Sequence, residues 1–402
     1  MNRNTEVIVI GGGYAGVMAA NRLTARADVT VTLVNPRPVF VERIRLHQQI
    51  AGTRDAAVDY GKVLAKGVEL VVDTVTRIDA AGRAVQLGVG GTLRYDYLVY
   101  AVGSGSADPT VPGAAEFAYP IASVEEAERL RPVLDAAPAT APVTIVGGGP
   151  SGIETAAELA EQGRKVTLVC GGDLGPTLHP RGRASVAGRL AALGVTVLDG
   201  RGTKVAAVTR DAVRLADGRE LPSEVTIWTA GFGVPDLALR SGLSTDALGR
   251  LRTDETLTSI DDERILAAGD SAAPSDLPFR MGCQSAVQLG PQAAETVLAR
   301  LAGTRPAPVS VGFAGTCISL GRRYGIFQVA TKDDIAKKQH IGGRPGAKVK
   351  EIICWSTVWQ LGYEARKPGR HTWWAKDPGR QELLRAKEAE GARTPATAEQ
   401  AA

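Results

Sequence analysis

Residues 143–172 read VTIVGGGPSGIETAAELAEQGRKVTLVCGG: a β-branched strand, a glycine-rich turn, an Ala/Leu-rich helix and a second β-branched strand. Residues 7–35, VIVIGGGYAGVMAANRLTARADVTVTLVN, have the same layout. The spacing in each stretch predicts a complete βαβ unit with the turn between its first strand and its helix. The chain is therefore expected to contain the same supersecondary unit twice.

The glycines of both turns fit a phosphate-binding role. They permit a tight turn and close approach of the backbone to a pyrophosphate, while the following helix directs its N-terminal N–H groups at that charge. One such motif alone is weak evidence, but two in full βαβ context predict two dinucleotide-binding loops. The glycines assigned to this role are Gly11, Gly13 and Gly16 in the first loop, and Gly147, Gly149 and Gly152 in the second.

The order of segments predicts one domain inserted in another. A hairpin pattern and a buried strand follow each unit, at 83–104 and 212–232, and a third strand, ERILAAGDSAA (263–273), comes later. We expect an α/β domain formed by 1–112 and 245–304, a second formed by 113–244, and a C-terminal region at 305–384. Residues 385–402 have no apolar periodicity and are expected to be disordered.

Composition narrows the functional class. Hydrophobic content is 44% and charged content 22%, and no apolar run reaches the length of a membrane-spanning helix. The start lacks a signal-peptide pattern, which predicts a cytoplasmic location. The four cysteines and four histidines show no metal-ligand spacing, so no metal is expected. Residues 319–380 hold 13 Lys/Arg against 5 Asp/Glu without a nucleic-acid-binding motif, so an anionic membrane or cofactor fits better than nucleic acid.

The combination GGGYAG, YAVGS, GGGPSG, TAGFG and AAGDS resembles the two-dinucleotide flavoprotein superfamily, which includes the disulfide reductases. The resemblance covers about residues 5–300 and implies a glutathione-reductase-like fold. It also implies FAD and NAD(P)H as cofactors, with a relay from nicotinamide C4 to flavin N5. Beyond the six loop glycines, the residues expected to bind cofactors are Tyr14, Ala15, Asn35, Pro36, Arg43, Val75, Ala101, Gly103, Gly231, Gly269, Asp270 and Gln284.

Within this superfamily the stretch after the first unit, VERIRLHQQIAG, has no C-x₄-C and excludes a disulfide reductase. CQSAVQLGPQAAETV (283–297) is similar to a helix of type II NADH:quinone dehydrogenases and of quinone reductases like apoptosis-inducing factor. The resemblance implies that Gln284 and Gln288 border a quinone pocket, although Cys283 replaces an alanine. It also implies that Glu154 handles protons near the flavin, which suits a reaction that takes up two protons. The alternatives are a helix with surface glutamines and a carboxylate that stabilises a helix N-terminus.

Both units lack the acid that usually ends the second strand and holds a ribose. Asn35 replaces it in the first unit, and its amide is expected to bond the FAD ribose with help from Arg37 and Arg43. Cys170 replaces it in the second, which removes the main bias toward NADH. Arg181 and Arg183 favour NADPH, whereas the nearby Asp173 favours NADH. Both alternatives remain open, as does reduction of the flavin by a substrate instead.

Cys317, in GTCISLG, resembles the active cysteine of sulfide:quinone oxidoreductases. The second loop has no cysteine where that family often places a partner, and an isolated buried cysteine is usually a packing residue. Sulfide oxidation is therefore the weaker alternative.

The C-terminal region contains a further helical pattern, KVKEIICWSTVWQLGYEARKPG (348–369). Its predicted apolar face is formed by Val349, Ile352, Ile353, Ser356, Trp359 and Tyr363. With Trp373 and Trp374 and the surrounding basic residues, segment 348–374 suits peripheral contact with the inner face of the cell membrane. Packing over the flavin domain or pairing in a homodimer remains the alternative. The resemblance to the quinone enzymes implies that either Lys348 or Lys350 corresponds to a lysine near the quinone.

The sequence thus predicts an FAD-dependent NAD(P)H dehydrogenase that delivers electrons to a quinone or a similar small aromatic acceptor. One alternative is a soluble flavoenzyme that modifies a small aromatic metabolite. A second, from outside enzymes, is a redox-sensing NAD(P)H-binding flavoprotein.

Overall fold

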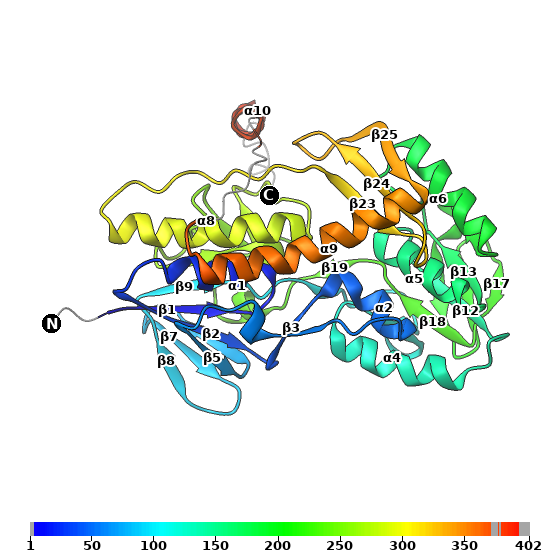
Figure 1. Cartoon of the computed structure of the whole chain (residues 1–402), viewed down its shortest axis with the longest axis horizontal. Helices are drawn as coiled ribbons and strands as arrows, with labels where there is room; N and C mark the ends of the chain where they lie inside the picture. Colours follow the sequence, from blue (N-terminus) through cyan, green and yellow to red (C-terminus); the bar gives the residue numbers. More distant parts are fainter. Residues whose placement is uncertain (1–3, 371–376, 378, 394–402) are drawn as a thin grey trace, which may run out of the picture.

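The computed structural model describes residues 4–370, 377 and 379–393. Its first layer is a five-stranded parallel sheet with the order β21-β9-β1-β2-β5 (Figure 1). The first βαβ unit supplies β1 (Thr5–Ile10), α1 (Tyr14–Leu23) and β2 (Val29–Asn35), and β1 pairs with β2 from Thr5 to Ile10. The edge strand β21 (Ile265–Ala267) follows the second βαβ unit in the chain but pairs with β9 (Tyr97–Tyr100). The first sheet therefore contains strands from both sides of that unit.

The remaining elements of this part surround the sheet. Strands β6, β7 and β8 form a three-stranded antiparallel sheet, as the hairpin pattern predicts. The bounds are β3 (Val39–Val41), α2 (Leu46–Ala51), β4 (Ala57–Asp59), β5 (Val68–Val72), β6 (Val75–Asp79), β7 (Ala84–Leu87), β8 (Thr92–Arg94), β10 (Gly105–Ser106), β20 (Leu251–Thr253), β22 (Ala272–Pro274) and α8 (Cys283–Leu301).

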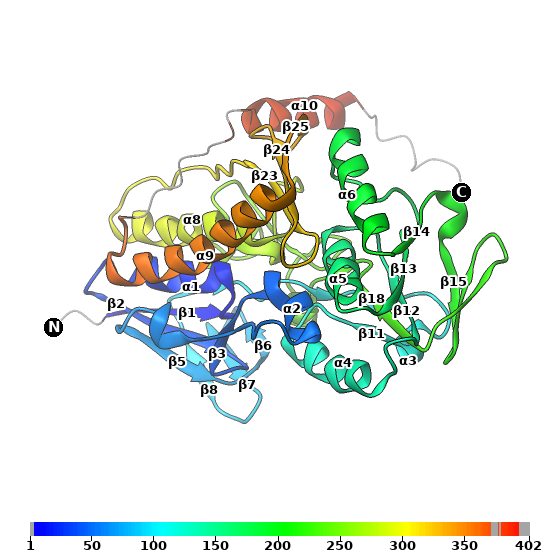
Figure 2. The ribbon, with the colours of Figure 1, turned by 45° about the vertical axis from the view of Figure 1, so that its right-hand side comes forward.

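A second five-stranded parallel sheet has the order β11-β18-β12-β13-β14 and lies beside the first (Figure 2). The second βαβ unit supplies β12 (Pro142–Val146), α5 (Pro150–Glu161) and β13 (Lys165–Val169). The other bounds are α3 (Ala114–Phe117), β11 (Ala118–Pro120), α4 (Val124–Ala136), α6 (Pro180–Ala192), β14 (Thr196–Leu198), β15 (Val205–Val208), β16 (Ala212–Leu215), β17 (Glu220–Pro222), β18 (Val225–Trp228), β19 (Phe232–Gly233) and α7 (Leu237–Arg240). Two Rossmann-like layers of this kind confirm the predicted fold class.

The C-terminal region connects the two parts. An antiparallel meander of β23 (Gly315–Ser319), β24 (Gly325–Ala330) and β25 (Ala336–Gly342) leads into the long helix α9 (Gly343–Arg366). Figure 1 shows α9, in orange, running from this meander to a place beside α1. The meander packs against α5 and α6 of the second part, and α9 contacts both the meander and α1, so the C-terminal region bridges the two parts.

The end of the chain differs from the sequence-based expectation. Disorder was expected from residue 385, whereas helix α10 extends over Arg380–Arg393. Arg380 fixes its start, since its buried guanidinium makes two 2.8 Å bonds to Glu255 and stacks over Phe279. This ion pair is invisible to a search for apolar periodicity. Residues 394–402 lie outside the described residues, as do Trp373 and Trp374.

Candidate functional site

The first glycine loop joins β1 to α1 and leaves room for a ligand at one position. A Cβ atom at Gly11 would lie 2.4 Å from the Ala101 carbonyl oxygen, and one at Gly16 would lie 1.8 Å from the Gly11 oxygen. These two glycines are required by packing. A Cβ at Gly13 would meet nothing within 4 Å, so open space remains beside the first turn of α1. The space beside Gly13 fits the pyrophosphate of FAD.

Asn35 braces the same loop from the end of β2. Its Oδ1 accepts the Gly12 N–H at 2.9 Å, and its Nδ2 donates to the Arg37 carbonyl at 2.8 Å. Tyr60, which the sequence analysis did not single out, donates its hydroxyl to the Gly12 oxygen at 2.8 Å. Asn35 therefore uses its amide to fix the loop. A bond to the ribose, through the second lone pair of Oδ1, stays a prediction.

Several predicted cofactor residues meet at the carboxyl ends of β9 and β21. The Asp270 carboxylate accepts the Ser104 hydroxyl at 2.7 Å and the Gly282 N–H at 2.8 Å. Arg43 Nη1 donates to the Ser104 oxygen at 3.2 Å and lies 3.9 Å from Asp270 Oδ2. This places a half-exposed cation and an anion where a ligand crosses a doubly wound sheet.

Three of the other predicted cofactor residues, Tyr14, Ala15 and Val75, are buried against neighbouring side chains. Ala15 lies 2.9 Å from the Cβ position of Gly269, which has a φ of +72°. Tyr14 is buried edge-on against Phe40, and Val75 is buried in the cluster formed with Ile10. Pro36 follows β2 in the chain, and Gly103 has a positive φ of 72°. Contact of these residues with FAD stays a prediction.

The second glycine loop repeats the geometry of the first. A Cβ at Gly147 would lie 2.5 Å from Thr229 Oγ1, and one at Gly152 would lie 1.9 Å from the Gly147 oxygen. A Cβ at Gly149 would meet nothing within 4 Å. The loop therefore leaves similar open space at the start of α5, which suits a second pyrophosphate. Gly231, with a φ of +80°, follows the neighbouring strand β18.

A buried polar cluster, defined here as Glu154, Lys350 and His47, lies between α5, α9 and α2. Lys350 Nζ donates to Oε1 of Glu154 at 2.9 Å, and Oε1 also accepts the Ser319 N–H at 2.9 Å. His47 Nδ1 lies 3.5 Å from Glu154 Oε2, while its Nε2 is buried without a partner. Of the two lysines that the sequence analysis could not tell apart, Lys350 is buried and Lys348 is exposed. His47 went unnoticed because only tertiary structure brings it to Glu154.

The protonation states of this cluster follow from its burial and charges. Burial alone would raise the pKa of Glu154, but the Lys350 ammonium and the Ser319 N–H bring it below its usual value. Burial lowers the Lys350 pKa, yet the Glu154 carboxylate raises it overall to well above normal. Burial is also the main reason that the His47 pKa falls to about 4. At neutral pH the cluster is a carboxylate–ammonium pair beside a neutral imidazole.

The predicted quinone-pocket glutamines hold the chain at 310–315 against α8. Gln288 is buried; its Nε2 donates to the Gly312 carbonyl and its Oε1 accepts the Gly312 N–H, both at 3.1 Å. One amide orientation of Gln284 gives the same pair of bonds to Gly315 and Ala314. Neither glutamine is the surface residue of the simpler alternative. Their contact with a quinone stays a prediction.

Three thiols lie near the buried polar cluster. Burial raises the pKa of Cys283 to about 12 and that of Cys354 to about 11, and Cys317 is shifted in the same direction by burial. These thiols are therefore protonated at neutral pH. Reactive cysteines have lowered pKa values, so this environment does not favour thiolate chemistry.

Helix α9 turns its aromatic residues outward. Ile352 is 62% exposed, Trp355 61% and Trp359 42%, and Trp359 stacks between Trp355 and Tyr363. The inward side of α9 carries Lys350, Thr357, Gln360 and Glu364. Two residues of the predicted apolar face, Ile352 and Trp359, are therefore exposed, and the other four are only partly buried.

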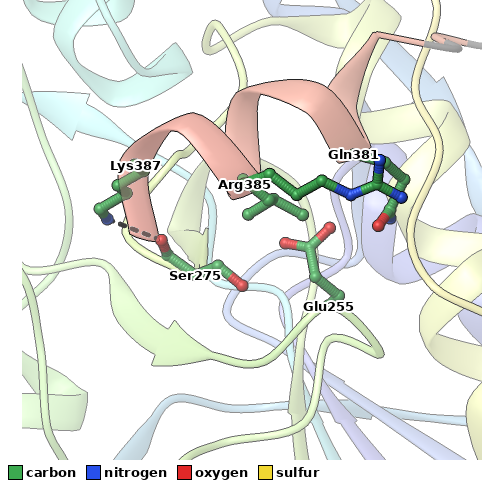
Figure 3. Close-up of a pocket in the computed structure, with 6 residues that line it drawn as sticks. Glu255, Ser275, Gln381, Arg385 and Lys387 are labelled. Carbon is green, nitrogen blue, oxygen red and sulfur yellow. Dashed lines mark hydrogen bonds between the residues drawn. The ribbon is translucent and has the colours of Figure 1, made fainter. Parts of the chain in front are cut away.

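A cavity of 520 Å³ lies under α10 and is lined by Glu255, Ser275 and Arg385 among others (Figure 3). Lys387 donates to the Ser275 carbonyl at 2.8 Å beside it. None of the predicted site residues lines this cavity. Among the described residues, no group of His, Cys, Asp or Glu is arranged to hold a metal ion.

Comparison with known proteins links this architecture to a family. The model of the pyridine nucleotide-disulphide oxidoreductase family matches residues 5–296. An NADH dehydrogenase-like protein of Mycobacterium tuberculosis is 30% identical over 381 residues, covering 87% of this chain and 93% of that protein. The type II NADH:quinone oxidoreductase of the same organism is 29% identical, covering 76% of this chain and 74% of that protein.

Solved structures agree in fold. The sulfide:quinone oxidoreductase of Aquifex aeolicus matches with a TM-score of 0.76 at 19% identity, covering 91% of this chain and 93% of that one. NDH2 of Plasmodium falciparum, solved with NADH, matches with a TM-score of 0.75 at 15% identity, covering 93% of this chain and 99% of that one. At these identities the structures establish the shared fold.

Proposed function

Because the chain belongs to the pyridine nucleotide-disulphide oxidoreductase family, we propose that it is an FAD-dependent NAD(P)H dehydrogenase that passes electrons to a quinone. The first glycine loop binds FAD and the second binds NAD(P)H. Relatives named as type II NADH:quinone oxidoreductases and as a demethylphylloquinone reductase support a quinone acceptor.

One observation carries this proposal: the buried polar cluster is built on the helix that begins at the second glycine loop. Glu154 lies two residues after Gly152 in α5, so its position relative to the nucleotide loop is fixed by a rigid helix. Lys350 reaches Glu154 from α9, on the side of the C-terminal region. An ionised carboxylate is therefore held near the second glycine loop by a rigid helix.

Bound FAD would supply the two-electron chemistry that links the nicotinamide donor to the acceptor. The chain's own residues bind the two nucleotides and manage protons. A quinone takes up two protons with its two electrons, and Glu154 is placed to hold one of them at Oε1 or Oε2. Lys350 keeps this carboxylate ionised, so Glu154 acts as a relay that takes up a proton from solvent and passes it on rather than storing one. The low pKa of His47 leaves its imidazole without a proton to give at neutral pH.

The C-terminal region is proposed to contact a membrane peripherally. Exposed indoles at Trp355 and Trp359 lie on the same helix as exposed Lys348, and indoles with basic residues suit a lipid headgroup layer. Within the described part of the chain, no helix is both long and apolar enough to cross a bilayer. Homodimer formation through the same face is the competing proposal.

Anaerobic titration of the FAD-loaded protein with NADH and NADPH tests the function. At least one nucleotide should bleach the flavin absorbance, and an added quinone should restore it. Bleaching by neither nucleotide would contradict the proposal and favour a flavoenzyme that oxidises its own small aromatic substrate. Bleaching without reoxidation by any quinone would instead support a redox-sensing protein.

A further inference from the structure

The ribose end of the second dinucleotide site lacks a carboxylate. Strand β13 ends at Val169, and Cys170 follows at the position that usually supplies the acid. A Cβ at Gly148 would lie 2.9 Å from Cys170 Cβ and 3.1 Å from its Sγ, so this side chain packs on the glycine loop. Burial raises the pKa of its thiol to about 12, which leaves it uncharged. Nothing at this position repels a phosphate.

The next acid along the chain, Asp173, is already paired. Its loop is attached to the glycine loop, because the Gly175 N–H donates to the Gly148 carbonyl at 2.8 Å. The Asp173 carboxylate accepts from Arg183 Nη1 at 2.9 Å. Its charge is therefore offset and one face is occupied, which weakens it as an acceptor for ribose hydroxyls.

Two cationic side chains, Arg183 and Lys204, lie at this end of the site. Arg183 lies in the first turn of α6, about one-third exposed, and its buried Nε–H has no acceptor. Lys204 lies against Gly171, with its Cγ 3.9 Å from the Gly171 Cβ position. The opposing carboxylate outside the ion pair is Asp199, exposed after β14. Because the Arg183 Nε–H is covered by protein, the exposed third of the Arg183 side chain and Lys204 are the groups available to a phosphate.

We propose that this loop selects the 2′-phosphate of NADPH over the 2′-hydroxyl of NADH, with Arg183 as the main anion-binding residue and Lys204 as a second. Asp173 holds Arg183 in place in the absence of nucleotide and shares it with the phosphate afterwards. The inference rests on the proposed function only in taking the second loop as the nicotinamide nucleotide site. Relatives named for NADH would differ from this chain in their donor.

Binding of two probes to the FAD-loaded protein tests this without any turnover. Adenosine 2′,5′-bisphosphate and 5′-AMP differ only in the 2′-phosphate, and isothermal titration gives a Kd for each. We expect the bisphosphate to bind about 10-fold or more tightly, since charge-assisted contacts of this kind have that effect. Arg183→Gln should remove the difference and leave the Kd of 5′-AMP unchanged. Arg210→Gln, which removes an equal charge from an exposed turn of the same domain, should preserve it.

The outcomes separate this inference from the proposed function. Equal affinity for both probes in the wild type overturns NADPH selection alone, and NADH should then bleach the flavin as fast as NADPH. A preference that survives Arg183→Gln overturns the assignment of Arg183 as the main anion-binding residue. Failure of both probes to bind, with no bleaching by either nucleotide, overturns the proposed function and this inference with it.

Discussion

Lys350 Nζ lies 2.9 Å from Oε1 of Glu154, and less than a tenth of either side chain is exposed. The pair joins α9, in the C-terminal region of the chain, to α5, the helix of the second βαβ unit. Removing one member of such a pair leaves the other charge buried without compensation. Stability and proton handling therefore depend on the same contact.

Substitution of this pair should separate its two roles. Lys350→Met should lower the free energy of unfolding by about 3–5 kcal/mol, because it leaves the Glu154 carboxylate buried and unpaired. Glu154→Gln should leave flavin reduction by NAD(P)H nearly unchanged but slow reoxidation by quinone by about 100-fold, the usual effect of losing an acid–base group. Denaturant unfolding and stopped-flow absorbance measure these effects. Lys348→Met, two residues away and exposed, is the control and should alter neither.

The neutral state of His47 predicts a pH dependence of stability. Its folded-state pKa of about 4 lies below the ordinary value of 6.5, so the unfolded chain binds more protons between these values. Stability should therefore fall as the pH drops from 6.5 toward 4, by up to about 3 kcal/mol. Three cations face the imidazole and lower its pKa further: Lys350, Arg322 and Arg45. The Glu154 carboxylate acts in the opposite direction and raises it.

Urea unfolding across this pH window measures the effect. His47→Gln has no titrating imidazole and should show a shallower loss of stability than the wild type. Glu154 is present in both proteins, so its contribution largely cancels, and the difference between them should grow as the pH falls from 6.5 toward 4. Identical pH profiles would show that the imidazole is not buried neutral.

Gly13 and Gly149, beside which the protein leaves open space, predict binding defects that can be separated. Gly13 and Gly149 have ordinary extended φ values, and a Cβ at either meets no protein atom within 4 Å, so alanine should be tolerated by the fold. Gly13→Ala should lower FAD occupancy, whereas Gly149→Ala should retain FAD and weaken NAD(P)H binding by about 10-fold or more, since each methyl enters a pyrophosphate cradle. Flavin absorbance and nucleotide titration measure these changes.

Gly152→Ala provides the contrast for this pair. Its Cβ would lie 1.9 Å from the Gly147 oxygen, so the substitution should lower the melting temperature rather than act on binding alone. Unchanged nucleotide affinity in Gly149→Ala would place the pyrophosphate elsewhere.

The sequence predicts the two βαβ units because their determinants are local. β-branched strands, glycines at fixed spacing and an Ala/Leu helix specify the turn geometry without reference to distant residues. The position of Glu154 near the second loop follows from the same helix. The fold class could therefore be derived from two stretches of about 30 residues each.

The partners of these elements could not be derived in this way. Nothing in the local sequence distinguishes Lys350 from Lys348. Lys350 is buried because it forms an ion pair with Glu154, which is distant in the sequence. The same holds for α9 as a whole, since Glu364 is buried against Arg22 while Trp355 faces outward. A periodicity argument assumes that apolar residues point inward, and it fails where ion pairs hold the inner face.

The outward aromatic face of α9 predicts binding to anionic vesicles. The double variant Trp355→Glu and Trp359→Glu should reduce co-sedimentation with phosphatidylglycerol vesicles by about 10-fold or more, because it removes the indoles and adds repulsive charge. Binding of the wild type should weaken as salt rises. Leu239→Glu is the matched control, because Leu239 is 62% exposed on α7 and should not affect binding. If vesicle binding is unchanged while sedimentation velocity shows that the double variant dissociates a dimer, then this face joins two copies of the chain instead.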